Sequence, residues 1–202
     1  MVSAIDPTEA HRQFLSDLAW ERTSPSWKDL GPLRDFNCLR DTDETPAQHT
    51  ERLKLRFDIP FDVIDQWLYR LYYNSHSVDN YGWLDYDRIR FEETAISATS
   101  LSTLYVIQQY QPWVHKRSTF DPFGDFMCTA RDKAHWQEHL TWRVPPIVLD
   151  VSTISEIPDY AEVVGPLQLV EGHTRLGYLL SMLRAGLITG DSQHCVYRMW
   201  QR

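Results

Sequence analysis

The sequence is poor in cysteine, and it has neither a leader-like start nor a long apolar run. Its three cysteines, Cys38, Cys128 and Cys195, are odd in number and show no paired spacing, which argues against a disulfide framework and for reduced thiols. The N-terminus lacks the basic and apolar regions of a signal peptide. No apolar run approaches the roughly 18–20 residues that a membrane span needs. We therefore expect a cytoplasmic protein that does not bind a membrane.

Positive charge is also scarce. The chain has 20 Lys and Arg against 28 Asp and Glu, a formal net charge of −8. The acidic excess is concentrated in residues 1–82, whereas residues 141–202 are nearly neutral. A protein that binds duplex DNA by neutralising many phosphates is usually basic. Any binding to DNA is therefore expected to be weak, while a small anion could be tolerated near the C-terminus.

The chain is rich in apolar and aromatic residues, with 43% hydrophobic residues and 8 Trp, 10 Tyr and 8 Phe among 202. It should therefore bury a substantial core. Residues 1–82 show helical patterns, with a capping start at Asp6-Pro7 and apolar spacing over 46–57 and 61–71. We expect a helical N-terminal extension over 1–82. Its rings, Trp67 among them, should form core or interface packing.

The remaining residues, 83–202, predict a domain that mixes strands and helices. Alternating or β-branched stretches predict strands over residues 83–91, 103–107, 112–119, 147–151, 167–170 and 195–200. Helical patterns cover residues 130–141 and 176–185. The predicted fold class is therefore α+β, with a helical extension followed by a domain built on a mixed sheet.

One turn in this domain has the features of a phosphate site. The short apolar strand 167–170 leads to Gly172, which permits a tight turn and close approach of a ligand to the backbone. The helix predicted to begin at Thr174 or Arg175 points unpaired N–H groups and its positive dipole end at this turn. Arg175 adds a forked, permanently charged donor, and His173 adds a donor that can shuttle a proton.

Two side chains of the turn have open roles. Thr174 could cap the helix or bind phosphate through its hydroxyl. Glu171 could hold a divalent ion, act as a base, or orient Arg175. An ordinary strand–Gly–helix turn without a ligand is the alternative explanation of the whole pattern.

The order of elements over about residues 130–202 resembles the ParB/sulfiredoxin-like superfamily. The resemblance is carried by Pro146-Ile147-Val148-Leu149-Asp150, by the Gly172-x-x-Arg175 turn, by Ala185-Gly186 at the helix end, and by the last strand. It implies a ParB/sulfiredoxin-like mixed sheet with helices. Gly172 and Arg175 are the matched positions, and His173 is a variant of the pattern.

The chain departs from two branches of that family. Partition proteins that act as CTP clamps usually have Gly-Glu-Arg/His-Arg, where this chain has His173 and Thr174. Sulfiredoxins have a cysteine directly after the glycine, and Cys195 does not match it. The Gly-His-Thr-Arg form looks more like the ParB-like nuclease branch of phage, plasmid and defence proteins, whose members are credited with NTP hydrolysis or DNA cleavage. Plasmid fertility-inhibition factors share this fold.

The resemblance implies a nucleotide-binding phosphohydrolase, an NTPase or a nuclease, that uses ATP or another NTP and Mg²⁺. Its catalytic residues would be Glu171, His173 and Arg175. The phosphate-binding residues would be Gly172, His173, Thr174 and Arg175. Asp150 and Glu171 each end a strand at the expected ligand edge of the sheet, so we expect Glu171 or Asp150 to hold Mg²⁺ or activate water, with Asp150 and Arg198 as accessory residues.

Two other functions remain open. In the first, the fold is a non-catalytic interaction module, and the acidic, aromatic N-terminal helices bind and inhibit a protein partner. In the second, His135, Glu138 and His139 form the His-x-x-Glu-His pattern of a zinc peptidase, with two histidines on one helix face. That pattern needs a third ligand, and Glu156 and Glu162 fall in loop-like sequence.

Two weaker clusters complete the set of candidates. The predicted strand 112–119 interleaves Trp113 with His115, Lys116 and Arg117, as a contact for single-stranded nucleic acid or a nucleotide does. The predicted strand 83–91 places acidic side chains that could bind Mg²⁺. These are Asp85 and Asp87, followed by Glu92 and Glu93. In both cases a solvated strand face is the simpler explanation.

Overall fold

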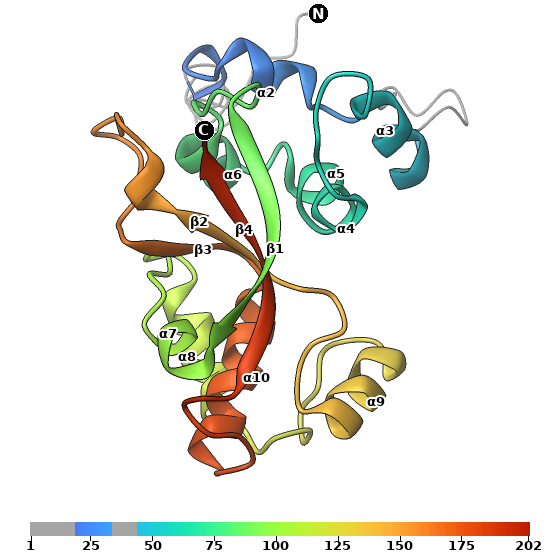
Figure 1. Cartoon of the computed structure of the whole chain (residues 1–202), viewed down its shortest axis with the longest axis vertical. Helices are drawn as coiled ribbons and strands as arrows, with labels where there is room; N and C mark the ends of the chain where they lie inside the picture. Colours follow the sequence, from blue (N-terminus) through green and yellow to red (C-terminus); the bar gives the residue numbers. More distant parts are fainter. Residues whose placement is uncertain (1–18, 34–43) are drawn as a thin grey trace, which may run out of the picture. The chain divides into compact units, whose positions relative to one another are not determined.

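A computed structural model describes residues 19–33 and 44–202, and these form two compact units (Figure 1). The helical unit comprises the described residues up to Ile89 together with Ile157–Glu162, and the sheet unit comprises Arg90–Glu156 and Val163–Arg202. The boundary expected between 82 and 83 therefore falls inside the helical unit. The helix expected from Asp6 lies outside the described residues.

The helical unit consists of short helices that begin at polar caps. They are α2 (Pro25–Asp29), α3 (Pro46–Leu53), α4 (Phe61–Val63), the π-helix η1 (Ile64–Leu68), α5 (Tyr69–Leu71) and α6 (Ser75–Tyr81). Thr45 and Gln48 form a capping box at the start of α3, and Asn74 accepts from two backbone N–H groups at the start of α6. Helices predicted over 46–57 and 61–71 are therefore confirmed, and the first ends at Leu53.

The rings of the helical unit are mostly its core. Trp27 and Trp67 are fully buried, and Trp27 stacks on Tyr72 with ring centroids 5.0 Å apart. The Tyr72 hydroxyl donates a 2.9 Å hydrogen bond to the Trp27 carbonyl. Tyr73 is an exception, since 47% of it is exposed. The aromatic set of this unit therefore serves packing, as expected for Trp67.

The sheet unit is built on four strands, so the α+β class is confirmed. They are β1 (Ile89–Ser97), β2 (Ile147–Asp150), β3 (Leu167–Glu171) and β4 (Gln193–Gln201), in the order β1-β4-β2-β3. Strand β2 runs antiparallel to β3 and parallel to β4. The sheet is therefore mixed, and its central strand β2 is buried at all four residues.

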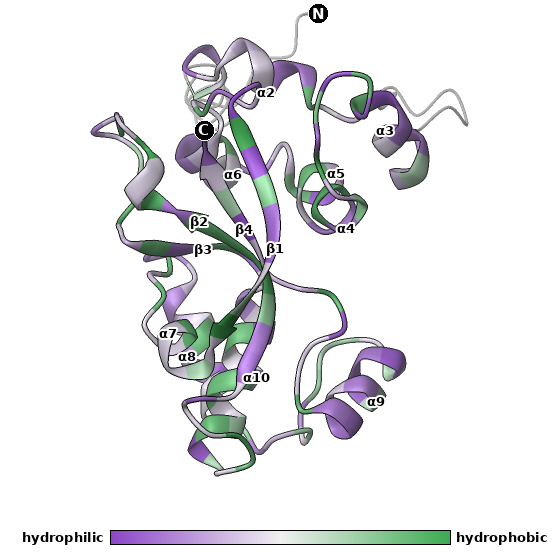
Figure 2. Cartoon of the chain, viewed as in Figure 1, coloured by the Kyte–Doolittle hydropathy of each residue, from purple (hydrophilic) through white to green (hydrophobic). Residues whose placement is uncertain are grey.

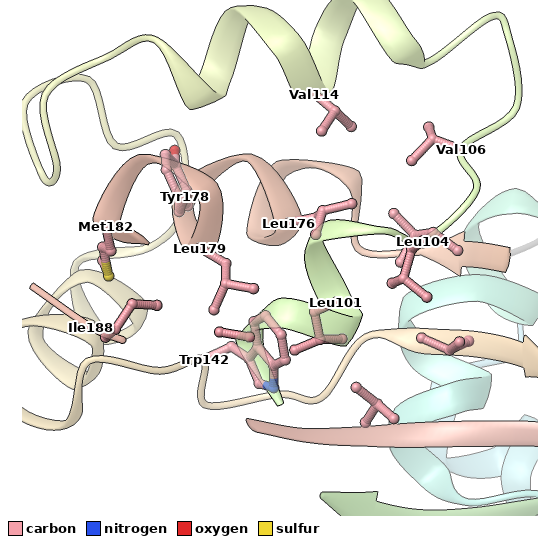
Figure 3. Packing of buried hydrophobic residues seen from close by; sticks show 14 of the residues in the cluster. Leu101, Leu104, Val106, Val114, Trp142, Leu176, Tyr178, Leu179, Met182 and Ile188 are labelled. Carbon is pink, nitrogen blue, oxygen red and sulfur yellow. The ribbon is translucent and has the colours of Figure 1, made fainter. Parts of the chain in front are cut away.

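Helices cover this sheet and enclose one core with it. They are α7 (Ala98–Ser102), α8 (Gln111–Ser118), α9 (Ala130–His139), the 3-10 helix η2 (Val151–Thr153) and α10 (His173–Arg184). In Figure 3, Leu101 of α7 and Leu176 and Leu179 of α10 point into a common apolar interior. Helix α9 differs from the others: Figure 2 shows it hydrophilic over most of its length, and Trp136 is its one buried residue.

Of the expected strands, 112–119 is wrong, and 83–91 and 103–107 are extended only in part. Residues 112–119 form helix α8 instead, because Pro112 occupies the first turn, where its missing N–H costs nothing, and three basic residues in the last turn suit the helix dipole. Residues 83–88 form turns, and β1 begins at Ile89. The stretch 103–107 contributes a single bridge, Tyr105 to Gln168. The elements predicted after residue 146 are all confirmed.

Candidate functional site

The turn between β3 and α10 has the conformation predicted for it. Gly172 adopts a left-handed conformation, with φ 113° and ψ 22°, and α10 begins at the next residue, His173. A Cβ on Gly172 would lie 2.5 Å from the Pro146 Cβ, so only glycine fits here. No side chain caps the helix, and its first internal hydrogen bond runs from the Leu176 N–H to the Gly172 carbonyl at 2.9 Å. The helix start is thus uncapped, as an anion-binding turn requires.

Arg175 fastens this turn to the segment that precedes β2. Its Nη1 donates a 2.7 Å hydrogen bond to the Val144 carbonyl, and its Nη2 lies 3.6 Å from a carboxylate oxygen of Glu171. The Arg175 side chain is only 14% exposed. The guanidinium therefore holds the backbone and Glu171 in place, which is a positioning role.

His173 pairs with Glu171 through one ring nitrogen only. Nδ1 lies 3.7 Å from Glu171 Oε2. The centroids of the His173 and Tyr110 rings are 4.3 Å apart. His173 is 9% exposed, and its Nε2 is buried without a hydrogen-bond partner. A buried polar nitrogen without a partner carries a desolvation cost, and such groups often mark a functional role.

The pKa of Glu171 lies below its ordinary value. Burial would raise this pKa, but the hydrogen bond with His173 and the charge of Arg175 outweigh burial. Glu171 is therefore ionised near neutral pH. A carboxylate at Nδ1 sets the orientation of an imidazole and leaves Nε2 to act on a ligand.

Thr174 is linked to α8. The Trp113 Nε1–H donates a 3.1 Å hydrogen bond to Thr174 Oγ1, and the Arg117 guanidinium lies 4.5 Å from the Trp113 ring. Trp113 remains 38% exposed beside the turn, whereas Arg117 is 3% exposed and pairs with Asp125 at 3.2 Å. Trp113 thus joins the site from a helix, although its sequence pattern placed it on a strand.

The sheet separates Asp150 from Glu171. In the antiparallel register of β2 and β3, Glu171 is opposite Ile147 and Asp150 is opposite Leu167. The two carboxylates therefore lie at opposite ends of the strand pair, on the order of 10 Å apart at ~3.3 Å per residue. They therefore do not share one ligand edge of the sheet, contrary to the expectation from sequence, and are too far apart to bind the same Mg²⁺ ion.

Asp150 is instead paired with Arg198. Asp150 accepts from Arg198 Nε at 3.0 Å and from the Ser152 backbone N–H at 3.1 Å. Burial would raise the pKa of Asp150, and the bonds from Ser152 and Arg198 outweigh it, so the pKa is lowered. Arg198 also lies 3.6 Å from Glu92. The expected accessory pair is therefore a structural ion pair away from the Gly172 turn.

The remaining acidic candidates also have structural partners. Arg56 forms a two-pronged ion pair with Asp87, with Nε to Oδ1 at 2.8 Å and Nη2 to Oδ2 at 2.6 Å. Asp85 accepts from the Ser26 hydroxyl at 3.4 Å, and Glu93 accepts from the Cys195 thiol at 3.1 Å. Over residues 19–33 and 44–202, no group of three or more His, Cys, Asp or Glu is placed to hold a metal ion.

The His-x-x-Glu-His motif lies on α9 as expected, with the rings of His135 and His139 4.4 Å apart between centroids. Glu156 belongs to the sheet unit and Glu162 to the helical unit. No third ligand gathers around the two histidines within the described part of the chain. The three-ligand zinc site of a peptidase is therefore not assembled there.

Within the same described ranges, no helix combines the length and apolar character needed to cross a membrane. Comparison with protein-family models, with curated protein sequences and with solved structures found no match to this chain.

Proposed function

We propose that the chain is a nucleotide-binding phosphohydrolase of the ParB-like type, with the phosphates of an NTP bound at the start of α10. The observation that carries the proposal is the buried, unpartnered Nε2 of His173 beside an uncapped helix N-terminus. A phosphate oxygen there would accept from His173 Nε2–H and from backbone N–H groups of the first helical turn. The absence of a side chain at Gly172 would bring those oxygens close to the backbone.

A nucleotide is favoured over bare phosphate by Trp113. This ring is more than a third exposed, and it is fixed to the turn by its hydrogen bond with Thr174. Stacking of a base on an aromatic ring contributes about 1–3 kcal/mol and tolerates any base. NTP is favoured over duplex DNA because the chain has a net charge of −8.

The chemistry would be proton transfer by His173, oriented by Glu171. Water would attack the terminal phosphorus, and the bond from phosphorus to the bridging oxygen would break. His173 Nε2 would give its proton to the leaving oxygen and recover one from the attacking water. The ionised Glu171 would stabilise the protonated imidazole before it gives up this proton and after it recovers one. Asp150 and Glu171 lie too far apart to share a Mg²⁺ ion, and the proton transfers above do not involve that ion.

The test is binding and turnover of ATP, GTP, CTP and UTP by the full chain, with and without Mg²⁺. His173→Ala should weaken binding by about tenfold or more and abolish phosphate release, since an acid/base group contributes 10²–10⁴-fold. His194→Ala is the matched control, because His194 is also a buried histidine with an unpartnered Nε2 but lies on β4. It should leave both activities intact.

Trp113→Ala should weaken binding of nucleotides but not of pyrophosphate, because only the base would stack on this ring. The proposal fails if the wild-type chain neither binds nor hydrolyses any of the four nucleotides. It also fails if His194→Ala lowers nucleotide binding and phosphate release as much as His173→Ala. The interaction module would then be the surviving alternative.

A further inference from the structure

Helix α9 carries two histidines that the proposed function does not use. The residues are His135 and His139, one turn apart on this helix of 10 residues (Figure 1). Their ring centroids are 4.4 Å apart, and the ring planes are inclined at 53°. The helix is fixed at its start by Thr129, whose hydroxyl accepts from the Asp132 N–H at 3.2 Å. It is fixed to the core by Trp136, which is 1% exposed.

The ring separation fits a shared metal ion. An imidazole nitrogen binds Zn²⁺ at about 2.0–2.1 Å, which puts the ring centre about 3 Å from the ion. Two rings bound at a right angle or at the tetrahedral angle then have centres about 4.4–5.1 Å apart. The observed 4.4 Å lies at the lower end of this range, so the two rings are close enough together to bind one ion.

The surroundings of the pair suit neutral ligands held in position. Burial lowers the pKa of His135, and the neighbouring His139 and Arg143 lower it further, against opposing effects of Glu138 and of a hydrogen bond with the Trp142 backbone. A neutral ring is the form that binds a metal ion. The backbone hydrogen bond with Trp142 also fixes the His135 ring, as hydrogen bonds to ligand histidines do in many metal sites.

The charges around the pair are balanced. Arg143 is engaged by Asp132 at 2.8 Å, and the Glu138 carboxylate lies 3.7 Å from His139 Nε2. His139 and Glu138 are 48% and 76% exposed at their side chains. A cation can therefore reach the pair from solvent.

We propose that His135 and His139 form a surface site for a late first-row divalent ion, Zn²⁺, Ni²⁺ or Cu²⁺, with water in the remaining positions. Imidazole suits these ions, and their affinity follows the order Ni²⁺ < Cu²⁺ > Zn²⁺. The site goes beyond the proposed function, because it lies on α9 and uses none of the residues of the Gly172 turn. It is not a peptidase centre, since no third protein ligand gathers there among the described residues.

The test is titration of the untagged, chelator-treated full chain with Ni²⁺, Cu²⁺ and Zn²⁺ by calorimetry. The wild type should bind one equivalent at this site. His135→Ala and His139→Ala should each lower its affinity by at least about tenfold, because loss of even an outer-shell partner costs 10–100-fold. His115→Ala on α8 is the matched control, since His115 is exposed and lies outside the pair.

Affinity should also fall at acid pH, because protons compete with the metal ion for the imidazole nitrogens. Circular dichroism checks that the variants fold, which is expected because they alter an exposed helix face. The proposal is overturned if the wild type shows no saturable binding, or if His115→Ala lowers the affinity as much as the α9 variants. Nucleotide hydrolysis is measured in parallel, and its failure would not affect this outcome.

Discussion

Gly172 lies so close to Pro146 that a Cβ on the glycine would come within 2.5 Å of the Pro146 Cβ. The contact joins the last residue before α10 to the residue before β2. Together with the hydrogen bond from Arg175 to the Val144 carbonyl, it fixes where the helix begins. The position of the helix start, and of His173 on it, therefore depends on a segment about 25 residues earlier in the sequence.

Replacing Gly172 by Ala should destabilise the fold strongly. A left-handed conformation costs a non-glycine residue about 1–2 kcal/mol, and the overlap with Pro146 should add roughly 1–3 kcal/mol. Gly186→Ala is the matched control, because Gly186 also has a positive φ, of 70°, but nothing lies within 4 Å of its added Cβ. Urea unfolding should show the larger loss for Gly172→Ala. Equal losses would mean that the Pro146 contact is easily relieved.

Asp150→Asn should lower the free energy of unfolding by roughly 1–3 kcal/mol at pH 7. The variant leaves the Arg198 guanidinium without its buried charged partner, and hydrogen bonds to charged groups contribute about this much. Glu92→Gln is the control, because Glu92 is 57% exposed and lies 3.6 Å from the same guanidinium. An exposed pair contributes ~0–1 kcal/mol, so this variant should change little.

The stabilisation of the fold by Asp150 should decrease as the pH falls. The folded chain holds the pKa of Asp150 below its ordinary value, so the ionised form stabilises the fold. This contribution is complete above about pH 5 and is lost as the pH falls through the folded pKa. The difference in stability between wild type and Asp150→Asn should therefore begin to shrink as the pH falls below about 4, and it should disappear only below the folded pKa of Asp150. A stability difference between the two proteins that grows toward low pH would contradict the lowered pKa of Asp150.

The sequence predicts the C-terminal elements well because proline or glycine residues mark where they begin or end. Pro145 and Pro146 precede β2, Gly172 precedes α10, and Gly186 follows it with a left-handed φ of 70°. These residues restrict the backbone by themselves, so no knowledge of the tertiary structure is needed. The turn proposed to bind phosphate is therefore visible in the sequence.

The site was harder to predict because its other parts depend on packing and on strand direction. The sequence pattern predicts a strand at Trp113, which lies on helix α8, because alternation over a few residues does not distinguish a strand from a helix packed on one side. The sequence also predicts Asp150 and Glu171 at one sheet edge, whereas β2 and β3 are antiparallel. Strand direction follows from the connections between strands, which local sequence does not encode.

The Cys195 thiol should react slowly with alkylating agents. Burial and the hydrogen bond to Glu93 raise its pKa to about 12, so at pH 8.5 its thiolate fraction is lower than that of an ordinary cysteine by a factor on the order of a thousand. Glu93→Gln should speed alkylation, and Glu92→Gln, one residue away, should not. Mass spectrometry of the Cys195 peptide after timed iodoacetamide treatment measures this. A fast wild-type reaction would contradict the raised pKa.

Gly177→Ala tests the close packing of α8 against α10. Alanine in place of glycine within a helix normally stabilises it by up to about 1 kcal/mol. Here the added Cβ would lie 2.3 Å from the Arg117 Cβ and 3.2 Å from the Val114 carbonyl oxygen. We therefore expect the opposite sign, a loss of roughly 1–3 kcal/mol, because α8 must move away from α10.

The same movement should weaken the proposed nucleotide site. Separation of the helices would break the hydrogen bond from Trp113 to Thr174, which spans them, and so remove the ring from the helix start. Nucleotide affinity should then fall about as far as in Trp113→Ala, while affinity for pyrophosphate should change less. If Gly177→Ala destabilises the chain as expected and leaves nucleotide affinity unchanged, the position of α8 does not determine the site, and the role given to Trp113 is contradicted.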